Sequence, residues 1–589
     1  MKILEFGVNN FRGISGGIEN NLIDFNNTNT IFLFGQNNVG KSTFLKSYEF
    51  FFSNQKPTID DFFKKLEGTK IEFVFMFELD ELDFSRIESN APGKSKSLKD
   101  KWLKNNCLKI RRIYELSLQG KIENVKNYTL NNDNENWEYP EENDWKEKNY
   151  GGIGLDGVFQ SLLPRPIFIK AMPSETEVED IINSILADKL TKGLKDSERE
   201  ELKKAQQTIK DLQDKLYNPK AIKKYKKDVN EHFADLFPNI KIELTEKDKV
   251  VWSESKFGKK FSIHFNKLKE DGKLDSSVPN SYDKVGHGAI RTAIFTLLLM
   301  RDIAEEFKRE ENRKDYLVLF EEPELFLHPR LMKELRTLIY KVTEDKFPYQ
   351  VLCASHSPQM IDISKPKSSL IRMINNELGT KLFQINDKYL SDVKEISVSQ
   401  LKDEMNEVLR FNPFICESFY ADEVILIEGP TEEIILRGYF SEVDCKKDIF
   451  IVNCGTVNNI PFYQKVFSKF NIKYHVICDT DSSVQEGVDQ YSNPIFTSGI
   501  QKTIYEQIKL DSDNTDLNVG ILRVHNTTFE PAHQDNSVEE LLRLPRYTGS
   551  HGKPYFANKY WKEILSCNLE HDSIDTVPIL KYLKEISEH

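Results

Sequence analysis

The chain has 589 residues, a net charge of -12 at pH 7, 39% hydrophobic residues and 30% charged residues. This length is too great for a single hydrophobic core, so we expect two to four domains. No apolar run approaches the roughly 20 residues of a membrane helix, and the opening MKILEFGVNNFRGISGG is too polar for a signal peptide.

The cysteines and the charge narrow the class further. Seven cysteines form no CxxC pair, which argues against a zinc ribbon and fits reduced thiols in a cytoplasmic protein. A nucleic-acid partner would have to meet local basic patches because the net charge is negative. Nine lysines against two acidic residues lie within residues 203–227, and a second cluster lies within 94–112. These patches are either solvated surfaces or phosphate-binding surfaces.

The first motif is FLFGQNNVGKST, between the strand TIFLF and the helix TFLKSYEFFF. It matches G-x-x-x-x-G-K-[ST], so backbone amides and a helix N-terminus are expected to bind phosphates. Lys41 would reach the terminal phosphates of ATP, and Ser42 would ligate Mg²⁺. The predicted nucleotide-binding residues of this loop are Gly35, Asn37, Asn38, Gly40, Lys41, Ser42 and Thr43.

The middle of the chain predicts a helical insert and then short strands. Residues 129–152 are polar and Asn-rich and predict a surface loop. Residues 179–235 have a helical pattern that includes a seam of about two heptads, which indicates a helical hairpin or a dimer contact. The seam consists of Leu202, Ala205, Ile209, Leu212 and Leu216. The segments KIEL, KVVW and KFSIHF follow as short strands, and a helix is expected over 286–307.

The stretch KVGHGAIRTAIF places Gly286 and Gly288 directly before that helix. It resembles a reduced ABC signature, which contacts the nucleotide bound by a partner protomer. The usual serine is missing, and a glycine-rich helix start is also simply a tight turn.

Two further motifs complete a predicted ATPase. The apolar strand YLVLF ends in Glu321, which would orient Mg²⁺, and Glu322, which would polarise the attacking water. The alternative is two exposed acids after a core strand. In VLCASHSPQMID a strand leads to His356, the position at which ABC-type ATPases contact the γ-phosphate. The first two-thirds of the chain, including its NNFRGI, therefore resembles the ABC/SMC type of ATPase head.

A second α/β pattern begins near residue 423, after a helical stretch over 391–419. The strand in ADEVILIEGPTEE ends in Glu428. Glu432 lies four residues later, one turn into the next helix, where we expect it to face the same site as a further metal ligand. The strand in KYHVICDTDSS ends in Asp479 and Asp481, whose like charges need either solvent or a metal ion between them. The order of strands and helices predicts parallel strands whose carboxyl ends converge on one site.

This second module resembles the TOPRIM domain, whose glutamate and DxD bind Mg²⁺. An ABC-type head followed by a TOPRIM domain resembles the OLD (overcoming lysogenization defect) family of ATP-dependent nucleases, which includes the nuclease subunit of the Gabija system. The phrase ESFYADEVILIEGPTEE is similar to the family's entry into its TOPRIM domain.

The resemblance implies an α/β fold with an ABC-type P-loop head, a helical insert and a Rossmann-like TOPRIM domain. The expected divisions are 1–178 and 236–390 for the head, 179–235 for an insert that mediates dimerisation, 391–420 for a connector and 421–589 for the TOPRIM domain. Family nucleases carry later acids and a lysine, for which the candidates are Glu530, Glu539, Glu540 and Lys553. We favour Glu539 as a metal ligand and Lys553 as the residue that stabilises charge on the scissile phosphate.

The resemblance further implies an ATP-regulated DNA endonuclease that uses Mg²⁺ or Mn²⁺, acts in anti-phage defence and forms a dimer or tetramer. The resemblance also implies an operon partner, either a helicase or a retron reverse transcriptase with its nucleic acid. It implies no association with a membrane. The alternative is a non-cutting SMC-like ATPase clamp whose TOPRIM fold only binds DNA. A primase or topoisomerase is disfavoured by the missing zinc module and by the domain order.

Overall fold

The computed structural model describes most of the chain. The described residues are 1–25, 28–130, 145–147, 156–190, 219–236, 240–246, 261–269, 271–275, 287–299, 315–344, 349–362, 369–376, 379–384, 413–442, 447–514, 519–534, 552–566 and 575–588. The chain divides into two compact units, unit 1 with Met1–Asp362 and 368–382, and unit 2 with 363–367 and 383–589. Within the described ranges, no helix is both long enough and apolar enough to cross a membrane.

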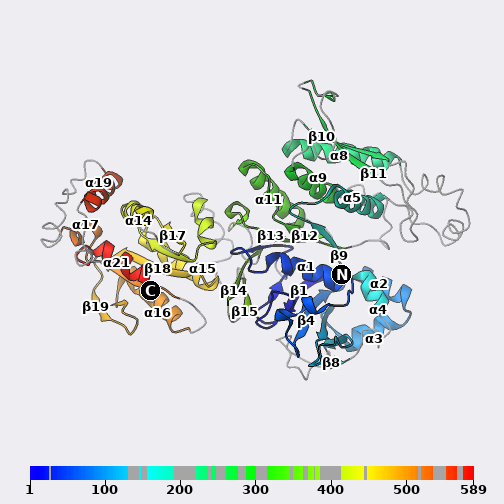
Figure 1. Cartoon of the computed structure of the whole chain (residues 1–589), viewed down its shortest axis with the longest axis horizontal. Helices are drawn as coiled ribbons and strands as arrows, with labels where there is room; N and C mark the ends of the chain where they lie inside the picture. The colour runs from blue at the N-terminus through cyan, green and yellow to red at the C-terminus, as the bar shows by residue number, and fades with distance from the viewer. Residues whose placement is uncertain are drawn as a thin grey trace, which may run out of the picture. The chain divides into compact units, whose positions relative to one another are not determined.

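Unit 1 contains an antiparallel sheet in the order β2-β1-β4-β6-β7-β8, with β5 paired to β6 (Figure 1). The middle of β4, residues 73–77, is buried without interruption, so both faces of the sheet are covered there. The strands are β1 (Lys2–Asn9), β2 (Leu22–Asp24), β4 (Lys70–Glu78), β5 (Leu103–Lys104), β6 (Cys107–Glu115), β7 (Lys126–Leu130) and β8 (Trp145–Glu147).

The second sheet of unit 1 has the order β15-β14-β3-β13-β12-β9. Its neighbours from β14 to β9 run parallel, and β3, β12 and β13 are apolar and almost fully buried. Their carboxyl ends therefore lie along one edge of the sheet. The strands are β3 (Thr30–Phe34), β9 (Arg165–Ile169), β12 (Tyr316–Glu321), β13 (Tyr349–Ala354), β14 (Leu370–Asn376) and β15 (Gly379–Gln384).

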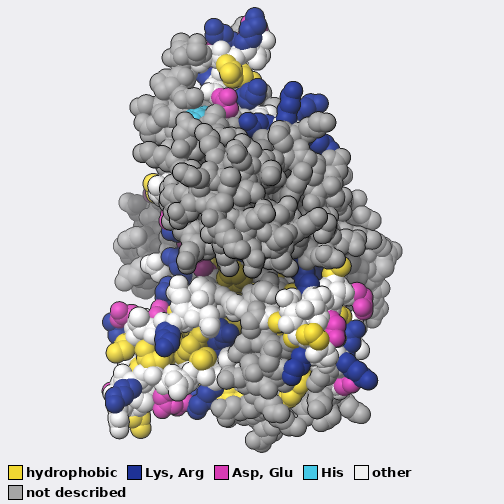
Figure 2. Space-filling model, turned by 90° about the vertical axis from the view of Figure 1, so that its right-hand side faces the viewer, with side chains coloured by type: hydrophobic (Ala, Val, Ile, Leu, Met, Phe, Trp, Pro, Cys, Tyr) yellow, Lys and Arg dark blue, Asp and Glu magenta, His cyan; other side chains and the backbone are white. Residues whose placement is uncertain are grey.

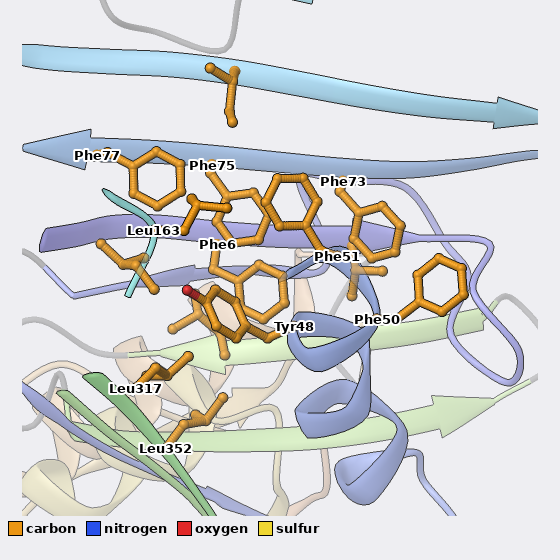
Figure 3. Packing of buried hydrophobic residues seen from close by; sticks show 14 of the residues in the cluster. Phe6, Tyr48, Phe50, Phe51, Phe73, Phe75, Phe77, Leu163, Leu317 and Leu352 are labelled. Carbon is orange, nitrogen blue, oxygen red and sulfur yellow. The ribbon is translucent and has the colours of Figure 1, made fainter. Parts of the chain in front are cut away.

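An aromatic core fixes helix α1 (Lys41–Phe52) between these two sheets. Figure 3 shows Phe6, Phe75 and Tyr48 packed together, with Leu317 of the parallel sheet nearby. The rings of Phe6 and Phe75 stack at 4.6 Å, and the rings of Phe51 and Phe75 lie 4.4 Å apart. Such contacts add about 0.5–1.5 kcal/mol per pair to the burial of apolar area. The core therefore holds the start of α1, and the loop before it, in a fixed place.

Unit 1 also contains a hairpin of β10 (Ile240–Glu246) and β11 (Phe261–Lys267), against which α8 and α5 pack. This hairpin confirms the strands predicted at KIEL and KFSIHF, whereas KVVW and the 202–216 seam lie outside the described residues. The helix predicted over 286–307 is described over residues 287–299 as α9. The described helices besides α1 are α2 (Glu81–Asn90), α3 (Lys94–Lys101), α4 (Asp156–Leu162), α5 (Glu175–Leu190), α8 (Pro219–Leu236), α9 (His287–Leu299) and α11 (Pro329–Glu344), with 3₁₀ turns η1 (Ile59–Asp61), η2 (Phe63–Lys65) and η7 (Pro358–Met360).

Unit 2 is built on a sheet of order β17-β16-β18-β21 in which every pair is parallel. This confirms the predicted βαβ order. The strands are β16 (Glu423–Ile427), β17 (Ile449–Asn453), β18 (Lys473–Asp479) and β21 (Leu522–His525), with a hairpin of β19 (Gln485–Val488) and β20 (Pro494–Phe496). The helices are α14 (Pro430–Glu442), α15 (Ile460–Lys469), α16 (Gly499–Ser512), α17 (Phe529–Ala532), α19 (Lys553–Ser566) and α21 (Pro578–Glu588), with 3₁₀ turns η9 (Pro413–Phe419) and η10 (Val457–Asn459).

Helix α19 packs directly on α14, and Gly438 is the reason that it approaches so closely (Figure 1). A Cβ atom at Gly438 would lie 2.5 Å from Nε1 of Trp561. The packing matters because α19 begins at Lys553 and α14 carries Glu432 in its first turn. Two predicted site residues are therefore positioned by one helix pair.

An ion network closes the amino-terminal end of the unit 2 sheet. The buried carboxylate of Glu423 lies 2.9 Å from Nζ of Lys447, 3.2 Å from Nζ of Lys473 and 3.0 Å from Nε2 of His475. The other ring nitrogen of His475 accepts a hydrogen bond from the Ile521 amide. Burial alone would raise the pKa of Glu423, but the hydrogen bonds from His475 and Lys447 and the charge of Lys473 lower it to about 2.

This network predicts a pH dependence of stability. The folded-state pKa of Glu423 lies below its ordinary value, so its stabilisation is complete above about pH 4.5 and is lost as the pH falls towards 2. We expect Glu423→Gln to lower the free energy of unfolding by roughly 2–3 kcal/mol at pH 6. In scanning calorimetry of the full chain, the difference between the unfolding midpoint temperatures of wild type and variant should decrease from pH 6 to pH 3.

The matched control is Glu442→Gln, at the exposed end of α14, which should leave the midpoint unchanged at every pH. A gap of constant size for Glu423→Gln would contradict the assignment of the stabilisation to the ionised carboxylate.

Candidate functional site

The predicted phosphate loop has the backbone that anion binding requires. It connects β3 to α1, and its conformation includes positive φ values at Gly35 (140°), Asn38 (63°) and Gly40 (107°). A Cβ atom at Gly35 would lie 2.3 Å from the carbonyl oxygen of Met373, so only glycine fits there. The residue before α1 is Gly40, which has no side chain, so no side chain at that position caps the first amides of the helix. Ser42 and Thr43 lie half-buried in the first turn.

Lys41 lies inside this loop. Its Nζ donates hydrogen bonds to the carbonyl oxygens of Gly35 and Gln36, both at 2.7 Å. Burial lowers the pKa of Lys41 to about 8, and the charges of Glu322 and Glu324 oppose that shift. Lys41 is therefore within electrostatic reach of the acids that follow β12.

The ends of β12 and β13 bring the other predicted ATPase residues to the same place. Glu321 is the last residue of β12, and Glu322 follows with a φ of 45° and donates its amide to the carbonyl of Ala354 at 2.7 Å. The Oε1 atom of Glu322 lies 3.9 Å from Nε2 of His356. Burial and the charge of Lys41 lower the pKa of His356. The structure thus groups Lys41, Glu322 and His356 around one edge of the parallel sheet.

Glu324 also belongs to this group, although the sequence motifs did not single it out. Its buried Oε1 accepts hydrogen bonds from the His356 amide at 2.7 Å and from the Ser355 hydroxyl at 3.0 Å. Burial raises the pKa of Glu324 even though these hydrogen bonds oppose the shift. Glu324 therefore ties the turn after β12 to the loop that carries His356. The sequence offered one signal for Glu324: it is the third acid within FEEPEL, directly after a buried strand.

The signature-like stretch is described from residue 287 onward, so Gly286 lies outside the described residues. A Cβ atom at Gly288 would lie 2.7 Å from both the Phe326 carbonyl and Cδ2 of Leu327, so Gly288 allows α9 to pack on the turn after β12. One turn later the buried guanidinium of Arg291 donates to the carbonyls of Glu321 and, at 3.5 Å, Leu325. Arg291 was not predicted, because nothing local marks it as a partner of β12.

In unit 2, the carboxyl ends of the parallel strands assemble a second site. Glu428 directly follows β16, Asp479 ends β18 and His525 ends β21, where the sheet register pairs Asp479 with His525. One ligand atom each of Glu432, Asp479 and His525 lie within 4.8 Å of one another, and all three side chains are buried. The predicted convergence of strand ends is therefore present in the fold.

The carboxylates of this site repel one another. Burial raises the pKa of Asp479 to about 7, with further contributions from the charges of Asp481 and Glu530. Burial also raises the pKa of Glu432 to about 8, with a contribution from Asp479. The pKa of Glu428 is raised by burial and by the two aspartates, while Lys553 opposes the shift.

This donor set fits a divalent cation. Oε2 of Glu428 and Oε1 of Glu530 are buried and have no hydrogen-bond partner among the described residues. Buried carboxylate oxygens of this kind are the ligands that Mg²⁺ and Mn²⁺ use, and two positive charges would relieve their repulsion. Asp481 is more exposed, and its amide donates to the Thr527 carbonyl at 2.8 Å, which holds it at the mouth of the site.

The late candidates separate into described and undescribed residues. Glu530, on α17, and Lys553, at the start of α19, both act electrostatically on Asp479. Glu539 and Glu540 lie outside the described residues, so the preference for Glu539 stays a prediction.

His525 was missed by the sequence reasoning. Its Nδ1 lies 3.3 Å from Oδ1 of Asp479, and burial lowers its pKa to about 3, which makes the ring neutral at pH 7. The only available signal was its place at the end of a fourth parallel strand, ILRVH.

A P-loop sheet in unit 1 and a four-stranded parallel sheet in unit 2 define an ATPase joined to a TOPRIM-like module with an acidic site. The family model described as "AAA ATPase domain" matches residues 1–361, and the chain belongs to this family. Residues 419–481 match the model described as "Overcoming lysogenization defect protein-like, TOPRIM domain". The expected resemblance to the OLD family is thereby confirmed.

The chain is similar to two curated nucleases. It is 23% identical to the Old nuclease of Escherichia phage P2 over 57% of this chain and 56% of that protein. It is 23% identical to endonuclease GajA of Bacillus cereus (strain VD045) over 77% of this chain and 71% of that protein. The match thus spans little more than half the length of the phage nuclease. Among solved structures, the SMC head domain from Thermotoga maritima matches with a TM-score of 0.34 and 10% identity, over 66% of this chain and 100% of that one.

The contacts of Glu324 generate a test. Glu324→Ala removes the acceptor that holds the His356 amide, so we expect ATP turnover to fall at least tenfold while the Kd for ATP changes less than threefold. Glu324→Gln keeps an oxygen in the same place and should retain most of the turnover. Steady-state ATPase kinetics and nucleotide titrations measure both quantities.

Glu334→Ala, at an exposed position of α11, is the matched control and should behave as wild type. Equal losses in the Ala and Gln variants would contradict a role based on this hydrogen bond.

Proposed function

We propose that the chain is an ATP-regulated, metal-dependent DNA endonuclease of anti-phage defence. The observation that carries the proposal is the convergence of Glu428, Asp479 and Asp481 at the carboxyl edge of a parallel sheet, with raised pKa values at Glu428 and Asp479. A bound Mg²⁺ or Mn²⁺ supplies a Lewis acid for the phosphodiester and a water of lowered pKa.

The chain's own residues have separate roles in this proposal. Glu428, Asp479 and Asp481 hold the cation, and Glu432 and Glu530 extend the acidic set beneath it. Lys553 is exposed at the first turn of α19, where its charge acts on the carboxylates, and it would stabilise the charge that develops on the scissile phosphate.

ATP binding is assigned to unit 1. Lys41 would bind the terminal phosphates, Ser42 and Glu321 would hold Mg²⁺, and Glu322 would polarise the attacking water beside His356. The 3.9 Å between Glu322 and His356 and the electrostatic coupling of Lys41 to Glu322 support this assignment.

DNA binding needs basic surface on a chain of net charge -12. A groove of about 580 Å³ runs between α8 and the β10–β11 hairpin, and Figure 2 shows Lys and Arg side chains gathered in this upper region. Its lysines are Lys223, Lys226, Lys227 and Lys241. We propose that this groove contacts the phosphate backbone.

Further parts of the proposal concern assembly and location. Gly288 and its undescribed neighbour Gly286 would complete a nucleotide site of a second protomer, which requires a homodimer or a tetramer. An operon partner, a helicase or a reverse transcriptase with its nucleic acid, is proposed by analogy. Cytoplasmic location is proposed from the free thiols of all five described cysteines.

The alternative is a non-cutting clamp. Its TOPRIM fold would bind DNA without chemistry, and clustered buried carboxylates would then only repel the phosphates. The raised pKa values of Asp479 and Glu432 therefore favour cleavage over the clamp.

Two substitutions separate the proposed activities. Asp479→Asn should lower DNA cleavage in Mg²⁺ or Mn²⁺ by at least 100-fold and leave ATP hydrolysis intact, because the two sites are built from different sheets. Lys41→Ala should abolish ATP hydrolysis, since it removes the charge that binds the phosphates. Plasmid cleavage and phosphate release are measured on the same preparations.

Glu506→Gln, an exposed acid on α16, is the control for Asp479→Asn and should keep both activities. Cleavage at the wild-type rate in Asp479→Asn would reject the nuclease assignment. Normal ATP turnover in Lys41→Ala would reject the ATPase assignment.

Self-association has its own test. Light scattering should give a mass of at least twice the 68.6 kDa of one chain, because the proposed nucleotide site takes residues from two protomers. The mass of a single chain, both with and without ATP, would contradict the proposal.

A further inference from the structure

Two buried histidines lie side by side in unit 2, with ring centroids 5.1 Å apart, and only one is fully used by the fold. Nδ1 of His533 lies 2.8 Å from the Phe529 carbonyl, and its Nε2 accepts a hydrogen bond from the Ile579 amide at 3.1 Å. Both ring nitrogens of His533 therefore have structural partners.

His525 is different. It has no solvent exposure, its Nδ1 faces the Asp479 carboxylate at 3.3 Å, and its Nε2 has no partner among the described residues. A buried polar atom without a partner costs about 1–3 kcal/mol. The contacts of His525 among the described residues therefore account for its Nδ1 and its ring but not for its Nε2.

The surroundings of His525 hold its ring towards the acids. Phe529 packs edge-on against it at 5.0 Å, and Tyr582 lies 5.6 Å away. The hydroxyl of Tyr582 donates to the Val524 carbonyl at 2.7 Å, so it is committed elsewhere. The imidazole is thus fixed by packing with one nitrogen beside Asp479.

The donor atoms around this nitrogen are spaced for a cation. One atom each of Glu432, Asp479 and His525 lie within 4.8 Å of one another, and the three residues are at most 8% exposed. Donors at about 2.1 Å around an octahedral cation lie roughly 3–4 Å apart. Small side-chain movements therefore suffice to bring these three atoms into one coordination sphere. We call this group the inner subsite.

The inner subsite differs chemically from the group of Glu428, Asp479 and Asp481. That outer group offers oxygen only, which suits Mg²⁺ and Mn²⁺ alike. The inner subsite adds an imidazole nitrogen, a ligand that first-row transition metals accept more readily than Mg²⁺ does. Asp479 belongs to both groups, so its two oxygens connect them.

We propose that His525 is the nitrogen ligand of a cation held in the inner subsite, and that this subsite takes Mn²⁺ in preference to Mg²⁺. The proposal rests on the metal dependence proposed above and adds the ligand and the selectivity. Occupation of the subsite would also neutralise Glu432 and Asp479 together.

The test compares cation binding by the full-length protein without nucleotide and without DNA. Mn²⁺ affinity is read by electron paramagnetic resonance of the free ion, and Mg²⁺ affinity by calorimetry. His525→Gln should weaken Mn²⁺ binding at least tenfold and change Mg²⁺ binding less than threefold. His533→Gln is the matched control, because it alters the neighbouring buried ring and leaves the inner subsite intact.

Each outcome decides between distinct readings. A parallel loss of both affinities in His525→Gln means that His525 only positions Asp479, and it overturns the proposal, as does no loss at all. Failure of the wild type to bind either cation overturns the metal dependence of the proposed nuclease itself. If the wild type binds both cations and His525→Gln keeps the wild-type preference between Mn²⁺ and Mg²⁺, the role of His525 is overturned, whereas the proposed metal dependence of the nuclease stands.

A second measurement avoids any dependence on the folding of the variants. Pulsed electron paramagnetic resonance of Mn²⁺ bound to the wild-type chain should detect coupling to an imidazole nitrogen. Stoichiometric Mn²⁺ without nitrogen coupling would overturn the proposal.

Discussion

The repulsion between buried carboxylates at the ends of parallel strands is the constraint on which the proposed chemistry of unit 2 depends. Parallel strands deliver their carboxyl ends to one edge, and here three of them deliver Glu428, Asp479 and His525. A pKa near 7 for Asp479, against an ordinary value of 3.8, corresponds to a penalty on the order of 4 kcal/mol for its ionised form. A bound cation would remove that penalty, so the geometry that costs the fold stability is also the basis of the proposed metal binding.

The two ends of β16 show how the fold tolerates this. At its first residue, Glu423 has Lys447, Lys473 and His475 as partners, and its pKa is lowered. Just beyond its last residue, Glu428 has acids as neighbours, and its pKa is raised. The carboxylate at one end of β16 is thus neutralised by the chain's own cations, whereas the carboxylate at the other end lies among like charges. This difference supports a structural role for Glu423 and the proposed functional role for Glu428.

In unit 1 the negative charges of the acids are offset by cations of the chain itself. The acids after β12 face Lys41 from the phosphate loop and Arg291 from α9, so cations of the chain itself lie among them. Burial lowers the pKa of Arg291 to about 10, which leaves the guanidinium charged at neutral pH. Because Arg291 bonds the backbone of Glu321, the helix that follows Gly288 is mechanically joined to the strand that ends in the predicted catalytic acids.

The sequence predicted those features that depend on local pattern, and it missed those that depend on long-range register. The phosphate loop, the strand ends at Glu321, Glu428 and Asp479, and the parallel order of unit 2 follow from apolar runs that end in glycine or acid. His525 could not be placed, because its contact with Asp479 arises from the pairing of β18 with β21, 46 residues apart.

Glu324 and Arg291 were missed for a related reason. Their hydrogen bonds join segments about 30 residues apart, and no periodicity in either segment announces the partner. The choice between Glu530 and Glu539 depends in the same way on where the chain passes after β21. The structure describes only Glu530 of the two, and Glu530 acts on Asp479.

The separation of the two sites bears on what ATP contributes. Each site is built from one unit alone. The acidic site lies in unit 2 and includes Glu428, Glu432, Asp479, His525 and Glu530. The candidate nucleotide site lies in unit 1 and includes Lys41, Glu322, Glu324 and His356. Hydrolysis of a phosphodiester is downhill and needs a cation, a water and charge stabilisation, all of which the unit 2 residues are suited to arrange. The energy of ATP is therefore not required for the bond cleavage itself. In the proposed function, ATP would instead control when the acidic site meets DNA, and the carboxylate cluster of unit 2 would carry out the cleavage.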